Sequence, residues 1–265
     1  MPCRPDSQCR NRIAVWLALT KNSGMSTHIT GISSMATRLL LAELTPLFEQ
    51  QTGAVVAIES TGGVDAARRV LAGEPFDVVV LAADAIDKLI AAGRVQAGSR
   101  VDLVHSGVAV AVRAGAHRPD IGSEDALRQA VLTAPSIGHS TGPSGVQLAR
   151  LFERWGIAGQ IASRLVQAPP GVPVGTLVAR GEVELGFQQL SELMHLEGVD
   201  VLGPLPAAIQ ITTTFSAGVF AGVPAGVPAG VLAGTAQAGT ARALLDFLAS
   251  PATADIKRRH GMEPA

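Results

Sequence analysis

The sequence of 265 residues contains no tyrosine, and its three lysines (Lys21, Lys88 and Lys257) are set against eighteen arginines. Aromatic residues make up only 3% of the chain, so a hydrophobic core must be built from Ala, Val, Leu and Ile. Both cysteines lie within the first ten residues. Their position excludes a disulfide framework, a redox pair or a cysteine metal site in the body of the protein.

The sequence also lacks an excess of charge of either sign, because 21 basic residues nearly balance 22 acidic ones and leave a formal net charge of −1. No run of like charges stands out, which argues against nucleic acid or an anionic membrane as a partner. No window of about 20 apolar residues is present, so we expect no membrane insertion. With 47% hydrophobic and 16% charged residues, the composition is that of a globular domain or a pair of lobes.

The first 25 residues stand apart from the rest of the sequence. Three arginines and the apolar run at 13–19 give them a weak likeness to a secretory signal, but a small-x-small cleavage site is missing. We therefore expect residues 1–25 to be a disordered arm or a misassigned start, with Met25 as the natural first residue. A cytoplasmic location follows as the expectation, with a periplasmic one as the alternative if the signal is real.

Short apolar runs alternate with stretches of helical period along the rest of the chain. Strands are expected at 29–32, 54–59 and 77–82, with helices at 35–50 and 64–72 between them. The run at 77–82 is too continuous for a strand with one wet face, which predicts a parallel sheet covered on both sides. After a long strand at 101–112, a second α/β set follows, with helices at 123–131, 144–155 and 172–180 and strands at 136–139, 164–167, 183–188 and 199–202.

A second long strand at 211–220 and helices at 237–249 and 251–260 return the chain to its first part. The predicted fold class is thus α/β, with two lobes, each a mainly parallel sheet flanked by helices, joined by two crossing strands. Lobe 1 should comprise residues 26–104 and 208–265, and lobe 2 residues 105–207. The four-residue repeat at 217–234 contains prolines that cannot continue a strand or helix, and we expect an exposed loop there.

Three predicted strand-to-helix turns share hydroxyls and glycines: 31–34, 60–63 and 140–145. Free backbone N–H groups at a helix N-terminus stabilise an anion, and glycine lets a ligand approach the backbone closely. In open α/β sheets such turns lie at the carboxyl ends of the strands, where ligands bind. Each turn alone is also explained by ordinary N-capping, but three turns from two lobes favour an anion site in a cleft.

Other site classes are disfavoured. There is no Walker A loop, no GxGxxG and no metal-binding spacing among the six scattered histidines, so we expect neither cofactor nor metal. His139 ends a predicted strand and titrates near neutral pH, which makes it the candidate proton carrier. Gln188 and Gln189 end another strand, where two amides could hydrogen-bond a carboxylate.

Several segments together resemble the molybdate-type branch of the type II periplasmic-binding-protein superfamily. They are Gly31-Ile32-Ser33-Ser34, the stretch from Leu47 to Gly53, Ala66 to Val80, Gly142-Pro143-Ser144-Gly145, Gly181 to Gly186, and Ala249-Ser250-Pro251 with Gly261. The resemblance covers residues 26–265 and implies two lobes that close on a small oxyanion or carboxylate. Carried over to this sequence, it implies ligand contacts at Ser34, Gly63, Ala82 or Ala83, Ser144 and Gln189. The three turns and the strand end at 188–189 add Ser33, Thr61, Gly62, Ser140 and Gln188 as further candidates.

Two positions depart from the molybdate pattern. The family has a ligand serine where this chain has Gly63, and a ligand tyrosine where it has Gln189, so a molybdate site would be short of two hydroxyl donors. The segments 186–193 and 203–206 are more similar to a smaller group of the superfamily, typified by aconitate isomerase. That resemblance implies an enzyme that moves a double bond in a small tricarboxylate.

Such a reaction needs a base for the allylic proton, for which His139 is the first candidate and Glu59 or Glu192 the alternatives. The competing hypothesis is a solute-binding receptor, which would need an ABC permease as its partner. A cytoplasmic effector-sensing module is a third possibility, disfavoured because no basic DNA-binding segment is present.

Overall fold

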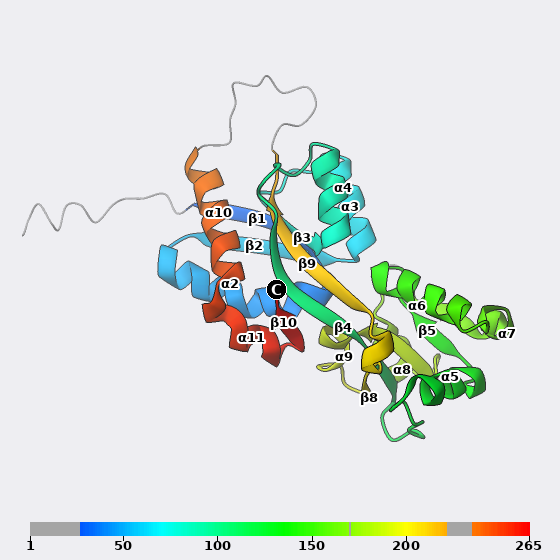
Figure 1. The fold of residues 1–265 in the computed structure, drawn as a ribbon. Coiled ribbons are helices and arrows are strands. Elements are labelled where there is room, and N and C mark those ends of the chain that lie inside the picture. The colour runs from blue at the N-terminus through cyan, green and yellow to red at the C-terminus, as the bar shows by residue number, and fades with distance from the viewer. Residues whose placement is uncertain (1–26, 170, 222–234) are drawn as a thin grey trace, which may run out of the picture.

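The computed structural model describes residues 27–169, 171–221 and 235–265. Figure 1 shows two α/β lobes joined by the long strands β4 (Val101–Arg113) and β9 (Thr212–Val219), which run side by side and antiparallel. The chain passes from the first lobe to the second along β4 and returns along β9. The predicted N-terminal arm and most of the predicted 217–234 loop lie outside the described residues.

The first lobe is built on β1 (His28–Ser34), β2 (Val55–Thr61) and β3 (Val78–Ala82), which are parallel, with β9 antiparallel at the side of β3. One face carries α2 (Arg38–Thr52), α10 (Thr235–Ala249) and α11 (Ala254–Arg259), with the short helices η1 (Met35–Thr37) and η4 (Pro251–Thr253) leading into two of them. The other face carries α3 (Gly63–Leu71) and α4 (Ala83–Ala91).

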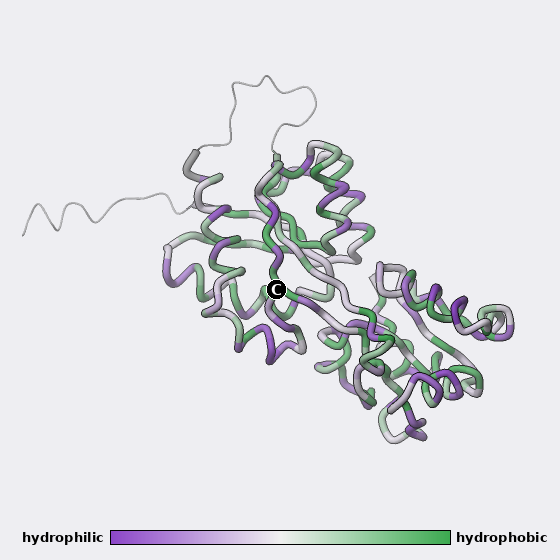
Figure 2. Tube along the Cα trace, in the orientation of Figure 1, coloured by the Kyte–Doolittle hydropathy of each residue, from purple (hydrophilic) through white to green (hydrophobic). Residues whose placement is uncertain are grey.

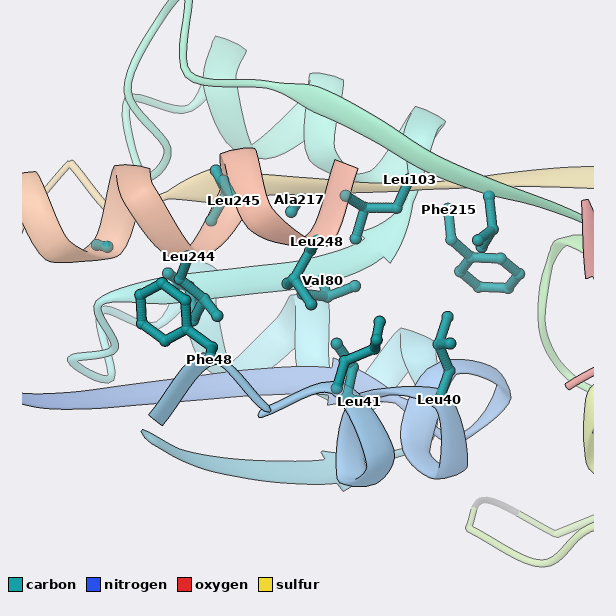
Figure 3. Packing of buried hydrophobic residues seen from close by; sticks show 14 of the residues in the cluster. Leu40, Leu41, Phe48, Val80, Leu103, Phe215, Ala217, Leu244, Leu245 and Leu248 are labelled. Carbon is teal, nitrogen blue, oxygen red and sulfur yellow. The ribbon is translucent and has the colours of Figure 1, made fainter. Parts of the chain in front are cut away.

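Burial along β3 confirms the predicted sheet with two covered faces. Val78 and Val80 pack toward α2 and α10, whereas Val79 and Leu81 pack toward α3 and α4, and all five residues of β3 are buried. Figure 3 shows the first of these cores, in which leucines of α2 and α10 pack over the same face of the sheet, with Phe48 beside Leu244. Burying a Leu or Val side chain contributes about 1.5–3 kcal/mol, so these two cores fix the helices on the sheet.

The second lobe repeats the plan. Its strands follow the order β4, β7 (Leu185–Gln189), β5 (Ile137–His139) and β6 (Leu165–Gln167), with β8 (Val199–Pro204) also paired to β4. The helices are α5 (Glu124–Thr133), α6 (Pro143–Arg154), α7 (Ala158–Ile161), α8 (Val174–Ala179) and α9 (Leu190–Leu193), with η2 (Ala162–Arg164) and η3 (Ala207–Ile209). In Figure 2 the hydrophobic colour follows the strands, and hydrophilic residues gather on the outer turns of the helices.

Strand β4 belongs to both lobes. Its first part pairs with β9 and with β10 (Met262–Pro264), and its second part pairs with β7 and β8. The partners change near Ser106 and Gly107, where β9 also begins at Thr212. The two chain crossings therefore lie together at one place between the lobes.

The predicted element order is confirmed with a few omissions. Helix α4 lies between the expected strands at 77–82 and 101–112 and was not predicted, although Ile86 and Leu89 have helical spacing and are both buried. The short elements α7, α9 and β10 were missed as well, because segments of three or four residues carry too little periodicity. Among the described residues, no helix is both long and apolar enough to span a membrane.

Candidate functional site

A cavity of about 760 Å³ lies between the two lobes, next to the crossing strands. The first lobe lines it with the start of η1, α3 and α4, and the second lobe with the turn before α6, one side of α6 and the segment that leads into α8. Thr213 and Phe215 of β9 form part of its wall. The cavity therefore lies at the carboxyl ends of the parallel strands, where ligands bind in open α/β sheets.

Most of the predicted contact residues line this cavity. They are Ser34, Gly62, Gly63, Ala82, Ser140, Ser144, Gln188 and Gln189. Ser33, Thr61, Ala83 and the proposed base His139 do not line it, and neither does Glu59. The three hydroxyl-rich turns thus do meet at one cleft, but not every residue of each turn faces it.

Ser33 and Ser34 show how a strand divides two neighbouring hydroxyls. Ser33 is fully buried and its Oγ is 2.7 Å from the Ser60 Oγ, so this side chain joins β1 to β2. Ser34 lines the cavity, and its buried Oγ has no hydrogen-bond partner among the described residues. Since successive side chains of a strand point to opposite faces, Ser34 is suited to bind a ligand and Ser33 is structural.

Four helices present uncapped N-termini to the cavity. The N-cap residues are Ser34 before η1, Gly62 before α3, Ala82 before α4 and Gly142 before α6, and none makes a side-chain capping hydrogen bond. By contrast, Ser123 caps α5 away from the cavity, its Oγ accepting from the Ala126 N–H at 3.1 Å. First-turn N–H groups at the cavity are thus left for a ligand, and ordinary capping does not explain these turns.

The turn before α6 leaves no space for a larger residue. A Cβ at Gly145 would lie 1.9 Å from the Ser140 carbonyl oxygen, so a side chain cannot be placed there without moving the backbone. The Ser140 and Ser144 hydroxyls are 3.2 Å apart and both line the cavity. Gly145 therefore permits the close approach that brings two hydroxyls and the α6 N-terminus to the same place.

Gln188 is tied into the second lobe. Its Oε1 accepts a hydrogen bond from the Gly175 N–H at 2.9 Å, and its side chain also hydrogen-bonds Glu192. Burial raises the pKa of the Glu192 carboxyl to about 7, and the hydrogen bond from Gln188 opposes that rise. Glu192 is partly buried and lines the cavity, so the cleft holds an acid that titrates near neutral pH.

Gln189 lies against the crossing strands. In the amide orientation that gives both the oxygen and the nitrogen a hydrogen-bond partner, Gln189 Nε2 donates to the Ser106 Oγ at 2.8 Å and Oε1 accepts from the Thr213 Oγ1 at 2.9 Å. Gln189 lines the cavity, but its amide already joins β7 to β4 and β9. Its amide is thus placed to hold the crossing strands beside the cleft.

His139 occupies a different environment from the one expected of a base in the cleft. Its Nδ1 lies 3.1 Å from the Ser140 carbonyl oxygen, and the ring packs beside Gly145 behind the cavity wall. A histidine at the last position of a strand can point to either side of the turn that follows. The sequence alone does not show whether the His139 side chain points into the cleft or away from it.

Three cations at the cavity were not anticipated from the sequence. Arg68 of α3 pairs with Asp65, Lys88 of α4 lies 3.7 Å from Asp84, and Arg150 of α6 makes no ion pair within the described ranges. All three are exposed, so they add positive charge at the mouth of the cleft rather than at its base. The helices of Arg68 and Arg150 were expected, whereas α4, which carries Lys88, was not, and neither was the face that each helix turns toward the other lobe.

Metal binding has no support in the part of the chain that the structure covers, where no group of three or more His, Cys, Asp or Glu residues could hold an ion. The donors around the cavity are amides, hydroxyls and the three cations, a set that suits an anion.

Known proteins share this sequence and fold. A relative from Pseudomonas sp, described as aconitate isomerase, is 37% identical over 244 residues, which are 90% of this chain and 88% of the relative. The periplasmic molybdate-binding protein of Azotobacter vinelandii is 20% identical, with a TM-score of 0.69 over 88% of this chain and 98% of that one. The sulfate-binding protein of Mycobacterium tuberculosis is 18% identical, with the same TM-score over 90% of this chain and 87% of that one.

These findings confirm the predicted fold class and the resemblance to both groups of proteins. They give no support to the expected cytoplasmic location, because the matching family is described as extracellular and the Azotobacter protein as periplasmic. The family model spans residues 29–263, nearly all of the described chain. The chain therefore belongs to the family of bacterial extracellular solute-binding proteins.

Proposed function

We propose that this protein is an isomerase that shifts the double bond of a small tricarboxylate, as in the interconversion of trans- and cis-aconitate. The observation that carries the proposal is the 37% identity with an aconitate isomerase over 90% of the chain. The cleft fits this substrate class, because a tricarboxylate needs several separate anion sites and four uncapped helix N-termini face the cavity.

The proposed binding residues are those of the uncapped helix N-termini. Ser34 and Gly63 would hold one carboxylate in the first lobe, and Ser140 and Ser144 a second in the opposite lobe. Arg150 and Arg68 at the mouth would meet the third. Hydrogen bonds to charged groups contribute about 1.5–3 kcal/mol each, so such a set can bind a trianion firmly.

Closure of the lobes completes the proposed site. Residues 26–104 with 208–265 would move against residues 105–207, about the crossing strands near Ser106 and Thr213. Closure would exclude water and bring the helix N-termini of the two lobes onto one ligand.

Incubation of the purified protein with each aconitate isomer, followed by NMR, tests the proposal. We expect either isomer to give the same mixture, with a rate proportional to protein concentration. Failure to convert either isomer would refute the isomerase function, whatever the protein binds.

A solute-binding receptor for an oxyanion is the second candidate, favoured by the family and by the fold of its molybdate- and sulfate-binding neighbours. An ABC permease would then be its partner. A thermal-shift panel of molybdate, tungstate, sulfate, citrate and the aconitates separates the two candidates, because a ligand that binds the folded state raises Tm, and a tighter ligand raises it more at the same concentration. A large shift with molybdate alone would support the receptor, and a shift with carboxylates the isomerase.

We further propose a periplasmic location, in keeping with the family's description. Separating periplasm from cytoplasm in cells that express the full-length gene, followed by N-terminal sequencing, tests it. Recovery from the periplasm with a trimmed N-terminus is the expected result, and an untrimmed protein in the cytoplasm would contradict it.

A further inference from the structure

The chemistry proposed for the cleft needs a group that removes a proton from one carbon and returns it to another. The titratable side chains that line the cavity are Arg68, Asp84, Lys88, Arg150 and Glu192. Arginine and lysine stay protonated near neutral pH, and Asp84 is exposed at the mouth beside Lys88. Glu192 is thus the one partly buried carboxyl group among the described residues of the cavity wall.

The two other bases considered from the sequence are placed elsewhere. His139 lies behind the wall against the Ser140 carbonyl, and Glu59 is exposed on β2 and paired with Arg69. Neither lines the cavity, so neither can reach a ligand there without a rearrangement of its strand.

Glu192 is held in place by a chain of hydrogen bonds. The Gly175 N–H fixes the Gln188 amide at 2.9 Å, and that amide in turn hydrogen-bonds Glu192. A Cβ at Gly175 would lie 2.7 Å from the Leu196 Cδ2 and 2.9 Å from the Leu193 Cδ2, so glycine allows α8 and α9 to pack closely here. The carboxyl group is thereby oriented by the second lobe and not by a counter-charge.

We propose, on the basis of the function proposed above, that the Glu192 carboxylate carries the proton between the two carbons of the substrate. It would take a proton from the methylene carbon, whose C–H electron pair becomes the new double bond to the central carbon. The electrons of the old double bond then form a C–H bond at the far carbon when Glu192 returns the proton. Nothing is oxidised or reduced, and no further reactant is needed.

The surroundings of Glu192 suit both halves of this transfer. Burial favours the neutral acid and the Gln188 amide favours the carboxylate, which together place the pKa near 7, where giving and taking a proton are balanced. The additional negative charge of the intermediate would spread into carboxylates that rest on the helix N-termini, where fixed donors stabilise it.

Replacement of the carboxyl group tests the proposal directly. Glu192→Gln should lower kcat at least 100-fold, the typical scale of general acid–base catalysis, and Glu192→Asp should keep part of the activity with a displaced pH profile. In the wild type, kcat/KM should rise with pH through about 7, because the ionised form starts the reaction. Glu197→Gln, an exposed carboxylate outside the cavity, is the matched control and should behave as wild type.

Binding is measured separately, with propane-1,2,3-tricarboxylate, a saturated tricarboxylate that has no double bond to move. Glu192→Gln should retain its thermal shift with this ligand, which shows that the variant is folded and its site intact. A Glu192→Gln variant that binds the ligand and isomerises aconitate within tenfold of the wild-type rate would overturn this proposal while leaving the isomerase function standing. Absence of turnover in the wild type would overturn both.

Discussion

At the residue scale, the site depends on which of two neighbouring side chains faces the cleft. Ser33 and Ser34 are adjacent and of the same type, yet one joins two strands and the other has a buried hydroxyl without a protein partner. The sequence placed both in the turn after a strand at 29–32, whereas they are the last two residues of β1. It could not decide between them, because the exact last residue of the strand determines which one points outward.

The two serines give a matched pair of variants. Ser33→Ala should lower the free energy of unfolding by about 1 kcal/mol, since it removes the hydrogen bond between the buried Ser33 hydroxyl and the half-buried Ser60 hydroxyl, with a smaller effect on binding. Ser34→Ala should leave the free energy of unfolding nearly unchanged and weaken propane-1,2,3-tricarboxylate binding about tenfold or more. Denaturant unfolding and calorimetry measure the two quantities, and the reverse pattern would refute the assignment.

Glu192 makes the stability of the ligand-free protein depend on pH. Its pKa is raised by burial from 4.5 in the unfolded chain to about 7 in the folded one, so the folded state holds the proton more tightly. Its contribution to stability is greatest below about pH 4.5 and falls as the pH rises to about 7. Glu192→Gln removes this dependence.

The measurement is the Tm difference between Glu192→Gln and wild type at pH 5 and at pH 8. The Tm of the variant relative to that of the wild type should be higher at pH 8 than at pH 5, because only the wild type must ionise a carboxyl group that burial keeps neutral. Groups whose pKa values are lowered, such as Glu43 and Asp102, are the same in both chains, so their effects cancel in the difference. An equal difference at both pH values would show that Glu192 is not held in its neutral form by the fold.

At the scale of elements, four helix N-termini from the two lobes meet at the cleft. The strand-to-helix turns could be predicted from alternating apolar runs and from Gly and Ser at their junctions. Helix α4 was missed, although Ala82 at its start lines the cavity, and so was α9, which carries Glu192. Short helices cannot be predicted from hydrophobic periodicity, because they contain too few residues to show it. Their position depends on packing against neighbouring strands, and the order of the strands in the sheet is not visible in the sequence.

The tight turn before α6 gives the prediction at this scale. Gly145→Ala would place a Cβ 1.9 Å from a backbone oxygen, so the start of α6 must move, at a cost of about 1–3 kcal/mol in stability and with weaker binding. Gly159→Ala in α7, where a Cβ meets nothing within 4 Å, is the control. Unfolding and ligand titration of both variants check this, and two indistinguishable variants would contradict it.

At the scale of the whole molecule, the two lobes were predictable from the two βαβ sets and the two long strands. What could not be predicted is the surface that each lobe turns toward the other. Val64 and Leu71 of α3 and Val146 of α6 are exposed apolar side chains that line the cleft from opposite lobes. Lobe closure would bury such side chains against each other and so favour the ligand-bound form.

We expect Val146→Asp to disfavour closure, because it places a charge on this apolar rim. Binding of propane-1,2,3-tricarboxylate should weaken several-fold, and the decrease in radius of gyration on ligand addition, measured by small-angle scattering, should shrink. Val55→Asp is the control, because Val55 is also an exposed valine but lies on the edge strand β2, outside the cleft. If both variants bind as wild type does, the apolar rim has no part in closure.

The central claim is that a solute-binding fold here catalyses the movement of a double bond. The most direct measurement is an NMR time course of pure trans-aconitate incubated with the purified wild-type protein. We expect signals of the cis isomer to grow until the ratio of the two isomers equals that reached in a sample begun with cis-aconitate. If the protein binds the tricarboxylate but the trans isomer remains unchanged, the protein is a binding protein and the account is wrong.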